Sequence, residues 1–278
     1  GVAPEATIIP VLVLDAWVVV GDCVEGGFAL FSGGTNSMIA AGIRYVTDLK
    51  INELNDAPVV INMSLGGPRS AEIEAAVDYA IENGVIIVAS AGNEGSDGMG
   101  YPGGLKQVIS TGAAGWASMF TGHWTDDVPE KTNQGDILGN NHQFYLEDFS
   151  SRPVKELGQK HQDLDVSAPG AWVVGPYKPR WELDDETGYY YLSGTSMSAP
   201  HVSGMAALMM QGNPDISQAD MERKMSIGAA GKPLPASDAI VAFPFNADGY
   251  YPAMWDGGDY GAGFLQADQL LKVFGRGK

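Results

Sequence analysis

Three apolar runs separated by two helical patterns constrain the fold of this chain more than any other feature of its sequence. The runs are residues 7–14 (TIIPVLVL), 59–65 (VVINMSL) and 85–90 (VIIVAS). Each has the length of a strand, and runs that are apolar rather than alternating predict strands buried on both faces. Such strands, linked by helices, form a parallel sheet that is covered on both sides. We therefore predict an α/β fold, a three-layer sandwich with a mainly parallel sheet.

The two helical patterns carry their own start and stop signals. In residues 37–49 apolar side chains recur at the helical period, and Ser37 is the expected cap. The second helix is expected to begin at Ser70, with Glu72 and Glu74 in its first turn, where the helix dipole favours anions. Asn-Gly at residues 83–84 is expected to end it.

The remainder of the chain is read in the same way. Strands are predicted at residues 164–169 and 189–192, and helices at 196–211, from the Ser217–Asp220 capping box onward, and at 264–274. Two stretches lack a sustained period, namely residues 15–34 and 115–161, and we predict that both are surface insertions. No internal repeat or low-complexity linker is present, so a single domain over residues 1–278 is expected.

Composition excludes several classes of function. No run approaches the roughly 18 apolar residues of a membrane helix, so no membrane span is predicted. The chain has 34 acidic and 16 basic residues, a net charge of −18, and no basic stripe to meet phosphates, so nucleic acid is not an expected partner. An acidic surface suits extracellular or salty media. The single cysteine, Cys23, rules out a disulfide within the chain.

Residues 194–204 (GTSMSAPHVSG) place a glycine, two hydroxyls and a proline at the mouth of a predicted helix of small residues. Ser196 would follow a strand and open that helix, at the sheet edge where open α/β sheets bind ligands. Its hydroxyl would lie among unpaired backbone N–H groups, which can stabilise negative charge on a bound carbonyl oxygen. Without further motifs in the chain, the same residues would be typical of an ordinary helix cap.

Residues 194–204 also resemble the serine motif of the subtilisin-like serine proteases, the subtilases. Other stretches resemble further landmarks of that family in the family's order: residues 1–14 (GVAPEATIIPVLVL), 59–67 (VVINMSLGG), 85–95 (VIIVASAGNEG), 100–103 (GYPG), 165–170 (DVSAPG) and 260–265 (YGAGFL). The resemblance spans the chain apart from the two insertions. It implies the subtilisin-like α/β fold and hydrolysis of peptide bonds through an acyl-enzyme.

The resemblance implies roles for individual residues. Ser196 would be the nucleophile, and Asn93 would donate a side-chain hydrogen bond in the oxyanion hole. An extended peptide would bind by strand addition between two backbone edges, which implies broad specificity. The residues of these edges are Ser64, Leu65 and Gly66 on one side and Gly33, Gly34 and Thr35 on the other.

The primary specificity pocket is implied in the same way. Its walls would be Ala91, Gly92 and Gly100, which are all small and leave room for a large apolar side chain. Glu94 near its base would also admit Lys or Arg. The loop that closes the pocket would contain a cis peptide bond before Pro102.

The base that would activate Ser196 is not evident in this sequence. In the family, the catalytic Asp and His precede the segment that residues 1–14 resemble. His201 would lie on the same helix as Ser196 but, at about 100° per residue, points about 140° away from it. His123, His142 and His161 fall in or beside the second insertion, where a surface role is expected.

Three explanations for the absent base are open. A larger protease was nicked before Gly1, and its N-terminal fragment with Asp and His stays bound or is lost; or the sequence is partial; or the chain is a non-catalytic relative that only binds peptides. The first makes that fragment a partner beside protein or peptide substrates. The related sedolisin group is disfavoured, because it places an Asp where Asn93 stands.

The resemblance also implies structural calcium and a secreted enzyme. Carboxylates cluster at residues 182–186 and 256–259, but neither cluster follows an EF-hand pattern, and both could be solvated loops. No metal ligands are therefore named.

Overall fold

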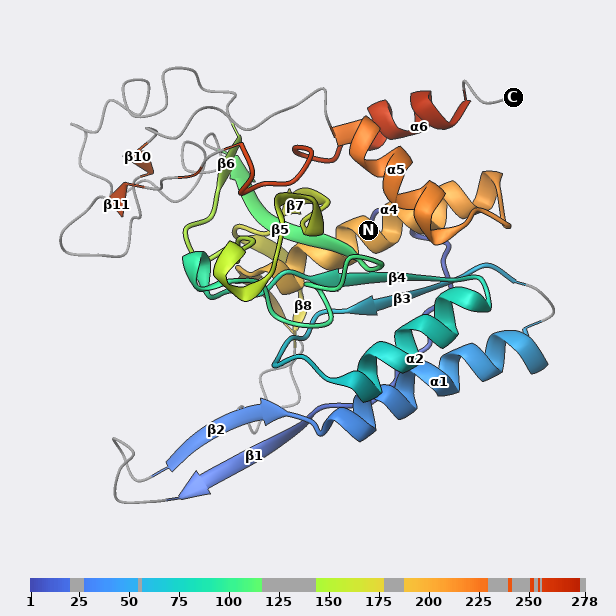
Figure 1. Ribbon diagram of the computed structural model, residues 1–278, viewed down its shortest axis with the longest axis horizontal. Coiled ribbons are helices and arrows are strands. Elements are labelled where there is room, and N and C mark those ends of the chain that lie inside the picture. The colour runs from blue at the N-terminus through green and yellow to red at the C-terminus, as the bar shows by residue number, and fades with distance from the viewer. Residues whose placement is uncertain are drawn as a thin grey trace.

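The computed structural model in Figure 1 describes residues 1–20, 28–54, 57–116, 144–177, 188–229, 240–241, 251–252, 255 and 257–275. At the centre of this part of the chain lies a five-stranded sheet in the order β3-β4-β5-β6, with β7 also paired to β5. The strands are β3 (Val59–Met63), β4 (Val85–Ser90), β5 (Ile109–Trp116), β6 (Phe144–Leu146) and β7 (Val166–Pro169). Every pairing is parallel except β5 with β6. The predicted, mainly parallel sheet is confirmed.

Helices cover both faces of the sheet (Figure 1). One face carries α1 (Asn36–Asn52) and α2 (Ala71–Glu82), and the other carries α4 (Thr195–Gly212), α5 (Gln218–Ala229) and α6 (Ala267–Gly275). The side chains of β4 alternate between two cores: Val85 and Ile87 face α1 and α2, whereas Ile86 and Val88 face α4 and α5. All of β4 is buried, which explains its unbroken apolar sequence. The three-layer sandwich is confirmed as well.

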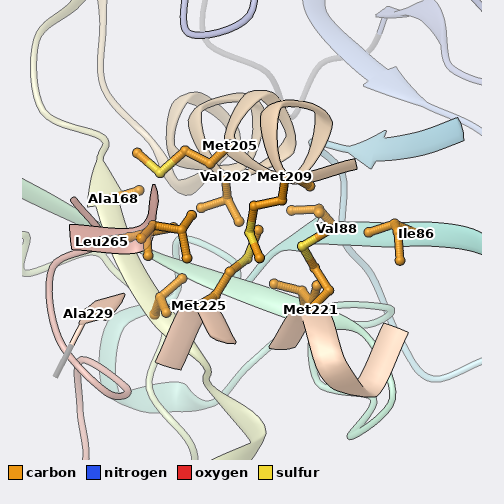
Figure 2. Close-up of a cluster of buried hydrophobic side chains, with 14 of the residues drawn as sticks. Ile86, Val88, Ala168, Val202, Met205, Met209, Met221, Met225, Ala229 and Leu265 are labelled. Carbon is orange, nitrogen blue, oxygen red and sulfur yellow. The ribbon is translucent and has the colours of Figure 1, made fainter. Parts of the chain in front are cut away.

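The core between α4, α5 and the sheet is rich in methionine (Figure 2). Met209 extends from α4 toward Met221 and Met225 on α5, Met205 of α4 belongs to the same cluster, and β4 closes the cluster from the sheet side. Met209, Met221 and Met225 have no exposed surface. Unbranched thioether side chains adapt to the irregular space between two helices and a strand. This core holds α4, the helix that carries Ser196, against the sheet.

Serine and threonine side chains cap the starts of α1, α2 and α5. Ser70 caps α2, as predicted. Ser217 precedes α5, and its oxygen accepts the N–H of Asp220 at 3.1 Å, also as predicted. The cap of α1 is Thr35 rather than Ser37, whose hydroxyl instead donates to a carboxylate of α2.

The predicted strand at residues 7–14 is wrong. The segment has no regular structure, and the side chains of Ile8 and Leu12 are 80% and 83% exposed. Val11 and Val13 lie partly buried against the α1–α2 core. Branched apolar residues favour a strand, but a strand also needs a neighbouring backbone to pair with. Within the described residues β3 pairs only with β4, so its outer edge takes no partner from this segment.

The first predicted insertion is not irregular. The strands β1 (Asp15–Val20) and β2 (Phe28–Gly33) pair as an antiparallel hairpin that projects from the body of the molecule (Figure 1). Branched and aromatic residues in both strands favour this pairing. The glycines that suggested irregularity stand mostly between the strands in the sequence.

The second predicted insertion is wrong for its last part. Residues 117–143 lie outside the described residues, but β6 and the turn that follows it belong to the core. Tyr145, Leu146, Ser150 and Ser151 have no exposed surface. The two serine hydroxyls pair with groups far away in sequence: the Ala113 N–H donates to Ser150 Oγ at 2.9 Å, and the Glu94 N–H donates to Ser151 Oγ at 3.0 Å. Local polarity therefore suggested a surface that the tertiary structure buries.

The strand before Ser196 lies outside the main sheet. It is β9 (Gly188–Leu192), which pairs with β8 (Val173–Tyr177) as a separate antiparallel ribbon. The pair β10 (Ile240–Val241) and β11 (Tyr251–Pro252) forms another small ribbon. Three short 3-10 helices complete the description: Gly95–Asp97, Lys155–Leu157 and His161–Asp163. Among the described helices, none has both the length and the apolar character needed to cross a bilayer.

Candidate active site

The turn after β4 directs an asparagine side chain at the first turn of α4. Asn93 Oδ1 accepts a hydrogen bond from the Thr195 N–H at 2.9 Å, and Thr195 Oγ1 in turn accepts the Gly92 N–H at 3.2 Å. Because the carbonyl end of the Asn93 amide is held in this way, its NH2 group is left for another partner. Nδ2 lies beside Gly194, and no described residue accepts a hydrogen bond from it.

Ser196 stands beside this amide at the mouth of α4. Gly194, the residue before the helix, has a φ of +156° and a ψ of 157°, a conformation that residues with a Cβ rarely adopt. The Gly194 N–H donates to the carbonyl of Gly170, just after β7, at 2.8 Å. Thr195 is fully buried and Ser196 is partly exposed. The first N–H groups of a helix lack helical acceptors, and that of Ser196 has no acceptor among the described residues.

A cavity of about 440 Å³ brings these groups together. Its walls are Ser90 and residues 65–67, 92–94, 97–100 and 195–196. Most of these residues follow β3 and β4 at their carboxyl ends, where parallel sheets form ligand sites. Ser196 and Asn93 therefore line the same cavity.

One side of the cavity carries negative charge. Ser151 Oγ donates to Glu94 Oε2 at 2.9 Å and accepts the Glu94 N–H at 3.0 Å, so the fully buried Ser151 holds this carboxylate in place. Asp97 supplies a second carboxylate to the lining. No lysine or arginine of the described residues lines the cavity. Its electrostatic potential therefore favours a cationic or neutral guest over an anionic one.

The small residues named for the pocket walls lie around this cavity. Gly92 and Gly100 line it directly. A Cβ on Gly92, whose φ is +114°, would come within 2.4 Å of Glu94 Oε2. Ala91 is fully buried behind the lining, and its carbonyl accepts the Gly100 N–H at 2.8 Å.

One of the two predicted peptide-binding edges borders the cavity. Leu65 and Gly66 line it, and Gly67 pairs with Tyr101 through two backbone hydrogen bonds of 3.0 and 2.9 Å. The peptide bond before Pro102 is cis, as predicted. Ser64 turns its side chain elsewhere, because its hydroxyl donates to the carbonyl oxygen of Ser196 at 2.7 Å.

The other predicted edge does not reach the cavity. Gly33 ends β2, Gly34 follows it, and Thr35 caps α1, and none of the three lines the cavity. Gly34 lies against the Val13 carbonyl.

No histidine of the described residues lines the cavity either. The His201 ring is turned along α4, where Nδ1 lies 2.8 Å from the Met197 carbonyl oxygen. His161 lies beside a different cavity. His123 and His142 fall outside the described residues.

A buried carboxyl, that of Glu147, lies four residues before Ser151 in the sequence. Glu147 is 1% exposed, and the Tyr145 hydroxyl donates to its Oε1 at 3.1 Å. Its Oε2 has no hydrogen-bond partner. Burial raises the pKa of Glu147 to about 7, against the lowering effect of the Tyr145 hydrogen bond, and the charge of Asp148 adds to the rise.

The other cavity, of about 360 Å³, lies at the opposite end of β7 from Gly170. Asp165, Glu222 and His161 contribute to its lining. Burial and the neighbouring Glu222 carboxyl raise the pKa of Asp165 well above its ordinary value, although the Ser110 N–H donates to Asp165 Oδ2 at 2.8 Å. Neither carboxyl lines the cavity of Ser196 and Asn93.

The described residues contain no cluster of metal-binding side chains. Among them, no three His, Cys, Asp or Glu side chains gather closely enough to hold a metal ion. The carboxylates of residues 182–186 lie outside the described residues, and Asp259 of the second cluster lies 3.8 Å from Arg152. Calcium also binds backbone and amide carbonyl oxygens, so the structural calcium expected from the sequence stays a prediction.

Three residues of the site were not foreseen from the sequence. Thr195 fixes the orientation of the Asn93 amide, Ser151 holds Glu94, and Asp97 lines the cavity. Thr195 stands next to Ser196 and could have been proposed from its place in the motif. Ser151 stands in a stretch taken for a surface insertion, and no local pattern marks it.

Comparisons with known proteins agree with this architecture. The profile of the subtilase family matches residues 1–244. The subtilisin of Bacillus sp. (strain TA39) is 31% identical over 271 residues, which cover 95% of this chain and 51% of that protein. Subtilisin DY of Bacillus licheniformis is 32% identical over 231 residues, which cover 81% of this chain and 62% of that protein.

Solved structures give the same answer. Sphericase superposes with a TM-score of 0.59 at 28% identity, covering 84% of this chain and 64% of that chain. A structure titled "S41 Psychrophilic Protease" superposes with a TM-score of 0.56 at 30% identity, covering 73% of this chain and 58% of that chain. The chain thus has the subtilisin-like fold and spans about half the length of several relatives that it matches. It belongs to the subtilase family.

Proposed function

We propose that this chain carries the nucleophile and the oxyanion hole of a serine endopeptidase. Its relatives are named as subtilisins and subtilisin-like proteases. The observation that carries the proposal is that Ser196 and Asn93 line one cavity, while neither the Ser196 N–H nor Asn93 Nδ2 has a partner among the described residues.

The proposed reaction passes through an acyl-enzyme. Ser196 Oγ attacks the carbonyl carbon of the scissile peptide bond and gives its proton to a base. The carbonyl oxygen becomes an oxyanion, which accepts hydrogen bonds from the Ser196 N–H and from Asn93 Nδ2. The amine then leaves with the proton from the base, and water hydrolyses the ester by the same steps. Both donors are held in advance by α4 and by Thr195, so they need little reorganisation as charge develops.

The base is proposed to lie outside residues 1–278. No described histidine lines the cavity, and the catalytic Asp and His of the family precede the segment that residues 1–14 resemble. An N-terminal segment of the same protein is thus the proposed partner that completes the site.

The substrates are proposed to be extended peptides of broad sequence. Leu65 and Gly66 border the cavity and offer backbone groups to a strand-like ligand. Besides large apolar side chains, Lys or Arg is proposed before the scissile bond, because Glu94 and Asp97 favour a cationic side chain there.

Peptides that differ only at the residue before the scissile bond test this preference, and kcat/KM is expected to be lowest for Glu. The Glu94→Gln variant should lose about fivefold for Lys and little for Phe, as expected for one solvent-accessible ion pair. Equal losses for Lys and Phe would contradict an electrostatic preference.

The decisive test is covalent labelling of the full-length protein with a fluorophosphonate, followed by peptide mapping. We expect one adduct, on Ser196, and none in Ser196→Ala. The second candidate function is that of a non-catalytic relative that only binds peptides. One observation supports it: no histidine of the described residues lines the cavity. A folded full-length protein that binds peptides but takes no label at Ser196 would establish that candidate instead.

Calcium and location are further parts of the proposal. Structural calcium is proposed to stabilise the fold, and a melting temperature unchanged by a calcium chelator would contradict this. Secretion is supported by the net charge of −18, which suits extracellular media. Fractionation of the producing cells, with recovery of the protein from the medium, tests it.

A further inference from the structure

A chain of three side-chain hydrogen bonds links α4 to β3 and returns to the nucleophile. Ser203 Oγ donates to Asn62 Oδ1 at 3.0 Å. Asn62 Nδ2 donates to Ser64 Oγ at 3.1 Å, and Ser64 Oγ donates to the Ser196 carbonyl oxygen at 2.7 Å. This series of hydrogen bonds therefore begins and ends on α4 and passes through β3 and the turn after it.

The last bond of this chain replaces one that the helix cannot make. In an α-helix the carbonyl of Ser196 would accept the N–H of the residue four positions on, which is Pro200. Proline has no N–H, so this carbonyl lacks its helical donor. The Ser64 hydroxyl takes that place, and it comes from the peptide-binding edge beside the cavity.

The direction of donation is the same at every step. A serine hydroxyl has one hydrogen, so a Ser64 that donates to Ser196 can only accept from Asn62. The Asn62 amide can donate to Ser64 only with its oxygen turned toward Ser203, whose hydroxyl donates to that oxygen. Ser203 is seven residues beyond Ser196, two turns along the same face of α4, so one helix supplies both ends of this hydrogen-bond series.

We propose that Asn62 and Ser203 are positioning residues for the nucleophile: acting through Ser64, they fix the Ser196 backbone at the mouth of α4 and couple it to the peptide-binding edge. This inference rests on the proposed function of Ser196. Positioning of a reacting group affects the chemical step more than the binding of substrate. Loss of either residue should therefore lower kcat and the rate of labelling at Ser196, with KM nearly unchanged.

The test uses the full-length protein and the second-order rate of fluorophosphonate labelling at Ser196. Asn62→Ala and Ser203→Ala are each expected to lower that rate and kcat by about fivefold, the effect of one net hydrogen bond. Because both substitutions interrupt the same series of hydrogen bonds, the double variant should be labelled no more slowly than Asn62→Ala alone. Ser203→Thr, which keeps the hydroxyl, should label at the wild-type rate.

A matched control separates positioning from general loss of stability. Asn52 is another exposed asparagine whose Nδ2 makes a single hydrogen bond, to the Asp48 carbonyl at 2.8 Å on α1. Asn52→Ala should leave the labelling rate unchanged, and all variants are compared at equal folded fraction by thermal unfolding. If wild-type Ser196 is labelled and both alanine variants match its rate, the positioning role is refuted and the proposed function stands. If Ser196 of the wild type is never labelled, the proposed function and this inference fail together.

Discussion

At the scale of single residues, the two ends of the Asn93 amide differ: one is bound within the structure and the other is available to a ligand. Its oxygen binds the Thr195 N–H, and its Nδ2 remains unpaired among the described residues. The Asn93→Asp variant separates the two, because aspartate keeps the acceptor and loses the donor. We expect kcat to fall by about 100- to 1,000-fold, a range measured for such a donor in subtilisin and carried over here.

The measurement for Asn93→Asp is a steady-state assay with a peptide substrate, alongside thermal unfolding. KM and the melting temperature should change little, because the bond to Thr195 persists. A variant that keeps more than a tenth of the wild-type kcat would show that Asn93 does not stabilise the oxyanion.

Glu147 makes the stability of the protein depend on pH. In the folded protein its pKa is about 7, because of burial, while in the unfolded chain it titrates near 4.5. Below pH 4.5 both states hold the proton, and the stability that this group contributes is fully present. As the pH rises to 7 the unfolded state releases its proton first, so the free energy of unfolding falls, by about 3 kcal/mol at pH 8.

Denaturant unfolding at pH 5 and pH 8 measures this effect. Asp165 and Glu222 titrate in the same direction, so the contribution of Glu147 is the difference between the wild type and Glu147→Gln. In Glu147→Gln the free energy of unfolding should fall less between pH 5 and pH 8 than in the wild type, because glutamine does not ionise. Identical pH dependence in the two proteins would mean that Glu147 is not buried as a neutral acid.

The sequence predicted the site residues that stand in local motifs and missed those whose contacts are distant in sequence. Ser196 and Asn93 stand in motifs that carry their own context, and both line the cavity. Ser151 acts through contacts with the loop after β4, 57 residues away in sequence. The Gly33–Thr35 edge was inferred from resemblance alone, and in this structure those residues serve the hairpin and the α1 cap.

At the scale of elements, α4 depends on the methionine core beneath it. Met209 is fully buried between α4 and α5 (Figure 2). Met209→Ala removes buried thioether contacts and leaves a cavity, so we expect a loss of about 2–5 kcal/mol in the free energy of unfolding. Leu271→Ala, on the 46% exposed Leu271 of α6, is the control and should cost far less. A Met209 variant as stable as this control would show that the core is not packed as described.

Elements with local signals were predicted well, and elements that depend on a distant partner were not. The helix α2 has its serine cap and acidic first turn, and β4 is apolar throughout because both its faces are buried. Residues 7–14 have the same apolar character, yet no neighbouring strand pairs with them in the described structure. The polar turn after β6 is buried because distant backbone groups satisfy its side chains. Pattern alone does not show such pairing.

At the scale of the whole molecule, the described residues leave apolar surface exposed. Ile8 and Leu12 are largely exposed, and the outer edge of β3 has no partner among the described residues. Exposed apolar segments and unpaired strand edges favour association. We expect a protein consisting of residues 1–278 alone to unfold at lower denaturant concentration than the full-length protein, and to self-associate. Equal midpoints for the two would show that this part of the chain is complete in itself.

In the proposed function, Ser196 depends on a base outside residues 1–278. It is tested most directly by casein hydrolysis with purified residues 1–278, shown by mass spectrometry to contain no second fragment, beside the full-length protein. In subtilisin, removing the histidine alone costs nearly as much rate as removing the whole triad. We therefore predict only residual hydrolysis by residues 1–278 and ordinary protease rates when the upstream segment is present. Ordinary rates from residues 1–278 alone would contradict the account, because a base would then exist within this chain.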